Sequence, residues 1–435
     1  MIRIIASVAM IFWAAAAHAQ AEIRQVKSPG GIKAWLVEEP SIPFTALEIM
    51  FKGGAALDPA DKRGVANLMT GLLEEGAGEL NAQEFAAAQE RLAASFGFGV
   101  YDDTLTVSVR FLTENRTEVL ALLKSVLMTP RFDVDAIERV RTQVLSGIGS
   151  DANDPDSVAS AKWDDLAFGD HPYGSDLSGS LESVAAITRS DLFDAHTALL
   201  VRDNLFVSAV GDVTATDLGF ILDDLLGDLP MGDGRATPPA SFATQGGLTV
   251  VDMPTPQSVA LFGHVGIDRN HPDFFAAYIL NTILGGRGVE SRLTAEVREK
   301  RGLTYGVSTF LVSKEQAHMV MGQVASANDR IAEAIDVIRA EWVKMAREGV
   351  TAKELQDAKT YLTGAYPLRF DGNAKIADIL VGMQRQGLAV GYIATRNDRV
   401  NAVTLAEINR VASELLRPDD LHFVVVGQPE GLNQQ

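Results

Sequence analysis

Residues 284–305 combine a glycine-rich stretch with an arginine and a tyrosine seven positions apart. Three glycines fall within four positions, namely Gly285, Gly286 and Gly288. Such a backbone can bend and approach a ligand without obstruction by side chains. Farther along, Arg298 supplies a permanent charge on a rigid fork and Tyr305 supplies a phenol that donates a hydrogen bond. Both groups suit a peptide carbonyl that is turning into an oxyanion, so this segment is the candidate site.

The pattern around these residues predicts a helix from about residue 291 to Gly302 and a strand from Leu303 onward. On that strand Leu303, Tyr305 and Val307 would share one face, and Arg298 would meet Tyr305 where the helix gives way to the strand. A structural interpretation stays open from the residues alone. It takes the glycine as a helix cap, the arginine as a surface residue and the tyrosine as part of the core.

The candidate segment lies in the second of two similar halves. Arg91 and Phe98 correspond to Arg298 and Tyr305, each 207 residues later, and residues 205–211 correspond to 421–427 at an offset of 216. Further matches occur in the same order, with offsets that drift only as small insertions would cause. The sequence therefore predicts an internal duplication.

Strands and helices are distinguishable by their periods in both halves. Residues 104–111 alternate apolar and polar side chains, as a half-buried antiparallel strand does, and apolar residues at helical spacing follow. The nearly continuous apolar runs 205–210 and 421–426 indicate central strands. We predict an α+β fold of two homologous halves, each a mostly antiparallel sheet with helices packed on one face.

The N-terminal residues are typical of a secretory signal peptide. Arg3 precedes an apolar run over residues 4–17, and Ala17-His18-Ala19 has the small-x-small pattern of a cleavage site. An uncleaved amphipathic anchor is the alternative. We therefore predict a signal peptide at 1–19 and a periplasmic protein, with an N-terminal domain at 20–227, a Gly/Pro-rich linker at 228–247 and a C-terminal domain at 248–435.

Composition excludes several classes of function. The 435 residues include no cysteine, which removes disulfides and thiolate metal sites. The net charge of −19 disfavours nucleic acid and anionic lipid as partners. After the signal, no apolar run reaches the length of a membrane span, so no stable membrane insertion is expected.

The segment 284–305 resembles the C-terminal half of the pitrilysin/insulinase zinc peptidases, the inverzincins, which include the mitochondrial processing peptidase and small bacterial two-subunit enzymes. The resemblance extends over the mature chain, including His171-Pro172-Tyr173-Gly174. It implies that the halves close as a clamshell and that Arg298 and Tyr305 form the family's clamp on the substrate carbonyl. It also implies that the three glycines form the flexible substrate-binding loop of an alpha-type, non-catalytic subunit.

Active members of that family carry His-x-x-Glu-His on the first helix of the N-terminal half. Here Asn67, Thr70 and Gly71 occupy the three motif positions, and none of them is a good zinc ligand or a general base. The window for the third ligand, residues 145–149, contains no acid. The histidines that the chain does contain are scattered along the sequence and are interpreted as surface or capping residues. We expect no cofactor in this chain.

These observations predict a non-catalytic subunit of a heteromeric zinc metallopeptidase. Zinc is expected in a paralogous partner that bears His-x-x-Glu-His, in a heterodimer or larger assembly. Arg298 and Tyr305 would act in trans on an extended peptide, whose backbone would pair with a sheet edge of the partner. The alternative is a catalytically silent peptide-binding or scaffold protein of the same fold. A peptidase acting alone is not expected, because no nucleophile–base constellation is present.

Overall fold

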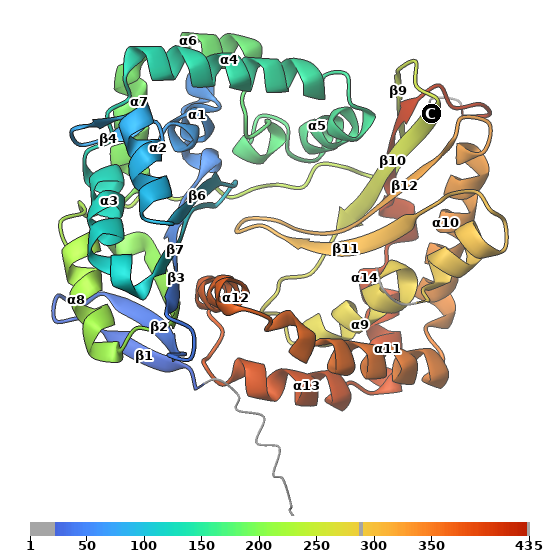
Figure 1. Ribbon diagram of the computed structural model, residues 1–435. Helices are drawn as coiled ribbons and strands as arrows, with labels where there is room; N and C mark the ends of the chain where they lie inside the picture. The colour runs from blue at the N-terminus through green and yellow to red at the C-terminus, as the bar shows by residue number, and fades with distance from the viewer. Residues whose placement is uncertain (1–21, 287–289, 433–435) are drawn as a thin grey trace, which may run out of the picture.

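The computed structural model describes residues 22–286 and 290–432 of the chain. These residues form two α+β halves whose sheets face one another across the molecule, with most helices on the outer sides (Figure 1). Among the described residues, no helix is both long enough and apolar enough to cross a membrane.

The first half is built on a six-stranded sheet in the order β1-β2-β8-β3-β7-β6. All neighbours are antiparallel except β2 and β8. Its larger elements are β1 (Arg24–Lys27), β2 (Lys33–Glu38), β3 (Phe44–Lys52), α1 (Val65–Gly71), α2 (Ala82–Arg91), β6 (Ser95–Val100), β7 (Thr104–Leu112), α3 (Arg116–Met128), α4 (Val134–Asp151), α5 (Pro155–Phe168), α6 (Leu181–Ala186), α7 (Arg189–Leu199), β8 (Leu205–Gly211) and α8 (Ala215–Leu226). A short hairpin joins β4 (Gly76–Ala77) to β5 (Leu80–Asn81).

The second half is built on a five-stranded sheet in the order β11-β12-β10-β13-β9, antiparallel except for β13 and β9. Its larger elements are β9 (Gly247–Asp252), β10 (Gln257–Val265), α9 (Phe274–Gly285), a π-helix (Thr294–Glu299), β11 (Val307–Ser313), β12 (His318–Ala327), α10 (Ile331–Glu348), α11 (Ala352–Ala365), α12 (Asn373–Arg385), α13 (Tyr392–Ala402), α14 (Leu405–Leu415) and β13 (His422–Gly427).

The two sheets have the same topology. The order β2-β8-β3-β7-β6 in the first half corresponds strand for strand to β9-β13-β10-β12-β11 in the second, and each has a single parallel pair in the same place. The apolar strands β8 and β13 are interior in their sheets, as their sequences predict. The α+β fold of two similar, mostly antiparallel halves is confirmed.

Each half also lends a helix to the inner face of the other half's sheet, which the sequence did not indicate. Helix α12 packs on β3 and β8, and the Ser208 hydroxyl donates to the carbonyl of Ala377 at 2.6 Å. Helix α5 packs on β10 and β13, where Trp163 joins a core with Val424 and Val426. This exchange ties the halves together through buried contacts.

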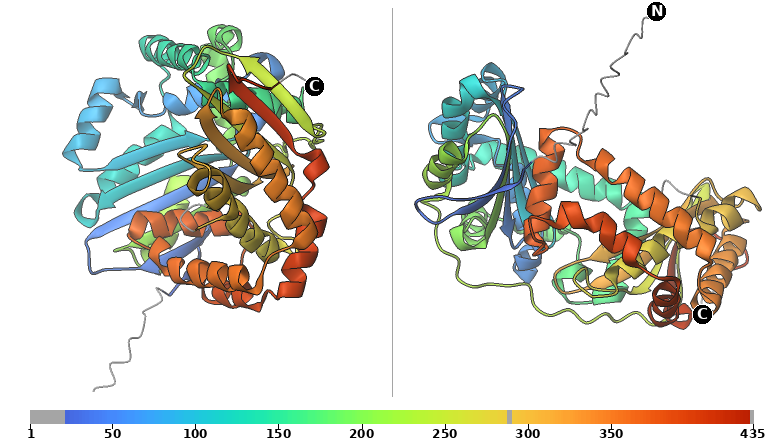
Figure 2. Two further views of the ribbon diagram at one scale, coloured as in Figure 1. Left: turned by 90° about the vertical axis from the view of Figure 1, so that its right-hand side faces the viewer. Right: turned by 90° about the horizontal axis from the view of Figure 1, so that it is seen from below.

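Residues 230–245 form no helix or strand and connect the two halves along one side of the molecule (Figure 2). The segment is too poor in apolar side chains to form a core of its own, but it docks on α5. Phe242 packs against Trp163 and Phe168 with ring centroids 6.3 and 6.0 Å away, and Thr237 is buried. The order of this segment therefore comes from the helix beneath it.

Candidate functional site

The corner between the π-helix and β11 places Tyr305 differently from the sequence prediction. The strand begins at Val307, not Leu303, and Tyr305 lies at a bend before it. Thr304 causes the bend, because its hydroxyl accepts from the Gly306 N–H at 3.0 Å and donates to the carbonyl of Ala325 at 2.6 Å. Leu303 and Val307 are buried while Tyr305 is 92% exposed, so the expected common face of these three residues is wrong.

Arg298 lies near the end of the π-helix and is exposed. Neither the Arg298 nor the Tyr305 side chain forms a hydrogen bond or ion pair with any described residue, and no cation–π contact joins them; the Arg298 backbone carbonyl accepts from the Gly302 N–H at 2.8 Å. The cations beside Arg298 are paired instead: Lys300 and Arg301 both bind Glu296, at 2.5 and 2.8 Å. Within the described part of the chain, the Arg298 guanidinium therefore stays available for a group from outside.

The corresponding residues of the first half are satisfied within the chain. Arg91 pairs with Glu118 at 2.9 Å. Phe98, at the position of Tyr305, stacks on Phe96 with ring centroids 6.5 Å apart and packs against the core. The duplicated corner thus serves packing in the first half, whereas in the second half it presents a guanidinium and a phenol that no described residue binds. The interpretation of Tyr305 as a core residue is wrong.

The glycines of the site have structural reasons of their own. Gly285 ends α9, and a Cβ there would lie 2.6 Å from the Thr309 hydroxyl and 2.8 Å from its backbone nitrogen on β11. Gly286 caps the helix by donating to the carbonyl of Thr282 at 3.1 Å. The helix-cap interpretation of this stretch therefore holds for Gly286. Gly288 lies outside the described residues.

The degenerate motif positions lie together on α1 and do not fit a zinc ion. The Thr70 hydroxyl is buried and donates to the carbonyl of Ala66 at 2.7 Å. Gly71 offers no side chain and faces Val140 of α4, whose methyl would be 3.3 Å from an added Cβ. Asn67 alone retains a side chain that is partly exposed. In the described ranges, no three His, Asp or Glu residues cluster in a way that would hold a metal.

Two histidines depart from the expected surface or capping roles. His196 and His264 are buried, and burial lowers the pKa of each to about 4. The Trp342 indole donates to Nε2 of His264 at 3.1 Å, which fixes a neutral imidazole in the core. His171 does cap, since its Nδ1 accepts from the backbone N–H of Tyr173 at 3.1 Å.

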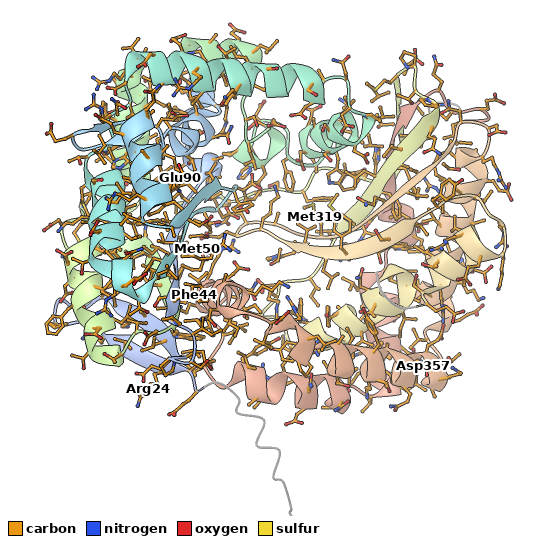
Figure 3. All side chains as sticks on the ribbon, in the orientation of Figure 1. Arg24, Phe44, Met50, Glu90, Met319 and Asp357 are labelled. Carbon is orange, nitrogen blue, oxygen red and sulfur yellow. The ribbon has the colours of Figure 1, made fainter. Side chains whose placement is uncertain are left out.

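A cavity of about 450 Å³ lies between the halves and was not predicted from the sequence. Met50 of β3, labelled in Figure 3, lines it. Glu48 of β3 and Asp378 of α12 line it as well. Burial, assisted by the nearby Asp378 carboxylate, raises the pKa of Glu48 to about 7, although the hydrogen bond from Ser108 and the charge of Arg110 both lower it. The signal that was missed is an acid inside the apolar strand β3.

Comparison with known proteins supports one family over most of the chain. Residues 33–180 match the insulinase family, peptidase family M16, and residues 186–362 match the peptidase M16 inactive domain. The non-peptidase homolog YmxG of Helicobacter pylori is 26% identical over 413 residues, which are 95% of this chain and 94% of that protein.

Solved structures agree with this assignment. A crystal structure described as a peptidase M16 inactive domain from Pseudomonas fluorescens is 28% identical, with a TM-score of 0.88 over 95% of this chain and 99% of that one. A chain of complex III2 from Candida albicans shares the fold alone, at 15% identity and a TM-score of 0.79, covering 95% and 98% of the two chains. Together with the lost motif on α1, these similarities identify an inactive homologue, and the chain belongs to the insulinase family, peptidase family M16.

Proposed function

We propose that this chain is the non-catalytic subunit of a two-part zinc peptidase and that Arg298 and Tyr305 act in trans on the partner's substrate. The partner would be a paralogue with an intact His-x-x-Glu-His helix, and its zinc would activate the attacking water. The ligand would be an extended peptide held between the subunits. The predicted signal peptide would export this chain, so the two subunits would meet in the periplasm.

The observation that carries this proposal is the contrast between the two corners of the duplicated fold. Arg91 is paired and Phe98 is packed within the chain, whereas the Arg298 and Tyr305 side chains have no polar partner among the residues that the structure describes. Leaving a tyrosine 92% exposed forgoes the burial that its ring would otherwise contribute to stability. Such an exposed aromatic and an unpaired arginine are typical of a surface that another molecule completes.

In the assembled enzyme, the two side chains would have distinct tasks. The Arg298 fork would bind the carbonyl oxygen of the bound peptide and hold the scissile region in line with the partner's water. The Tyr305 phenol would donate a hydrogen bond to the oxygen as it gains negative charge. Neither residue would need to gain or lose a proton during the reaction.

The proposal is tested by titrating the purified partner with this chain while peptidase activity is measured. Each protein alone should be inactive or nearly so, and activity should rise until the two are equimolar and then stay constant. A partner that is fully active by itself, and unchanged by addition of this chain, would contradict the proposal. The test also requires that the two chains co-elute as one complex.

A scaffold function is the second candidate, favoured by the structural match to a chain of complex III2. It predicts self-association or entry into a larger assembly without any gain in peptidase activity on mixing. The same titration therefore separates the two functions.

A further inference from the structure

A second group of cavities lies inside the C-terminal half, where α9, α11, α12 and α13 meet. Two cavities of about 340 and 670 Å³ share four lining residues. These residues are Tyr278 of α9, Tyr366 and Arg369 after α11, and Arg396 of α13. We call this surface the arginine–tyrosine groove. Gly286, which follows α9, also lines the larger cavity.

Arg396 is the central feature of the groove, because it is a buried charge. Only 4% of it is exposed, and no carboxylate of the described residues lies within ion-pair distance. Its guanidinium lies 4.5 Å from the ring of Tyr366 and donates to the carbonyl of Leu362 at 2.7 Å. These contacts offset part of the cost of desolvating a cation but supply no counter-charge. A buried, unneutralised cation in a cavity wall favours an anion that comes from outside.

Two further cations strengthen the positive potential of the groove. Arg369 is exposed, and Arg269 stacks over Phe274 at 4.0 Å and donates to the phenol of Tyr392. Neither forms an ion pair with a described residue. The larger cavity has no acid among its described lining residues, and the smaller has Asp378 alone. The groove thus gathers three arginines that no carboxylate of the described residues pairs with, although the chain has a net charge of −19.

We propose that the arginine–tyrosine groove binds a carboxylate of a peptide ligand, with apolar or aromatic side chains of that peptide against its tyrosine rings. Arginine forks bind carboxylates through paired hydrogen bonds. Because burial raises the pKa of Tyr366 to about 12, its phenol keeps its proton and remains a donor. The carboxylate belongs to the free C-terminus of the peptide or to an acidic side chain.

The inference rests on the proposed function only in taking the ligand to be a peptide, and it concerns binding to this chain alone. A purely structural Arg396 would change stability when replaced, yet would not distinguish a carboxylate from an amide. The test therefore compares ligands that differ in this one group.

Fluorescence anisotropy with the isolated full chain and three N-terminally labelled peptides of one apolar sequence provides that comparison. One peptide has a free C-terminus, one a C-terminal amide, and one an amide with a penultimate glutamate. We expect at least one carboxylate-bearing peptide to bind about tenfold or more tightly than the neutral amide. Tight binding of the first identifies a C-terminal carboxylate as the ligand, and tight binding of the third identifies an acidic side chain.

Arg369→Ala and Arg396→Gln should each abolish this preference. The control is Arg235→Ala, which removes an exposed arginine paired with Asp233 and should leave the preference intact. If Arg396→Gln fails to fold, the exposed Arg369 still carries the test. Equal affinity for all three peptides, or a preference that survives in Arg369→Ala, overturns the inference. Such a result would not change the outcome expected from the titration with the partner. The failure of this inference can therefore be distinguished from the failure of the proposed function.

Discussion

At the scale of single residues, the most informative comparison is between equivalent positions in the two halves of this chain. Arg91 is paired and Phe98 is packed, while the side chains at the equivalent positions, Arg298 and Tyr305, have no polar partner within the described ranges. The residue types and spacing of this pair were readable from sequence. Whether these side chains have partners could not be predicted from sequence. An arginine forms an ion pair only if the fold brings a carboxylate close to it, and the sequence does not place the elements that would do so. The buried positions of Glu48 and Arg396 were not predicted, for the same reason.

Glu48 gives a prediction at this scale, on pH. Its pKa is about 7 in the folded chain against 4.5 for an ordinary glutamate, so the folded state holds the extra proton between these values. The contribution of Glu48 to the free energy of unfolding should therefore fall as pH rises from about 4.5 to 7. Glu48→Gln removes this loss, because glutamine does not titrate. The free energy of unfolding of the variant should therefore increase relative to that of the wild type from pH 5 to pH 8, by on the order of 2–3 kcal/mol.

Denaturant unfolding of both proteins across this range checks the prediction. The difference between wild type and variant isolates Glu48 from His196 and His264, which titrate in both. The same measurement on Glu118→Gln, an exposed glutamate, should show no growing difference. A constant difference between Glu48→Gln and wild type at all pH values would contradict the account.

At the scale of elements, local period predicted the strands and helices well where one face is buried. The alternation over β7 and the helical spacing of α3 are both found in the structure. The start of β11 was misplaced because Leu303 and Val307 are both buried, which looks like alternation, although a turn made by Thr304 separates them. Periodicity reports buried positions and does not show the hydrogen bonds that make a turn.

Gly285 gives the prediction at the scale of elements. An added methyl would meet the hydroxyl and backbone of Thr309 where α9 passes β11, so Gly285→Ala should destabilise the chain by about 1–3 kcal/mol. Gly306→Ala is the matched control, because a Cβ there meets nothing within 4 Å. Thermal unfolding of both variants measures this. Equal stability of the two would show that the glycine at 285 is not required by packing.

At the scale of the molecule, the halves are fastened at the tips of two equivalent hairpins. The turn between β6 and β7 meets the turn between β11 and β12, where Lys314 pairs with Asp102 at 2.5 Å. Asp103 accepts from the Tyr173 phenol at 2.6 Å and from the backbone N–H of Glu315 at 2.8 Å. The duplication was readable from sequence. These contacts, and the exchange of α5 and α12, join distant residues and left no periodic signal.

Asp103→Asn tests this fastening. An amide has one acceptor oxygen where the buried carboxylate has two, so at least one of the bonds to Tyr173 and Glu315 should be lost. Backbone hydrogen exchange at residues 314–316 should become about tenfold faster or more. Asp233→Asn, at an exposed ion pair, serves as the control. Unchanged exchange at 314–316 would mean that the hairpin tips do not hold the halves together.

The most direct test of the central claim is kcat/KM of the mixed enzyme carrying Arg298→Ala in this chain, measured beside Arg91→Ala. The two variants remove equivalent arginines of the duplicated fold, and complex formation is verified for both. We expect Arg298→Ala to lower kcat/KM about a hundredfold or more, the usual effect of deleting a group that stabilises an oxyanion, and Arg91→Ala to leave it nearly unchanged. Equal activity of the two variants in intact complexes would contradict the claim that this chain completes its partner's active site.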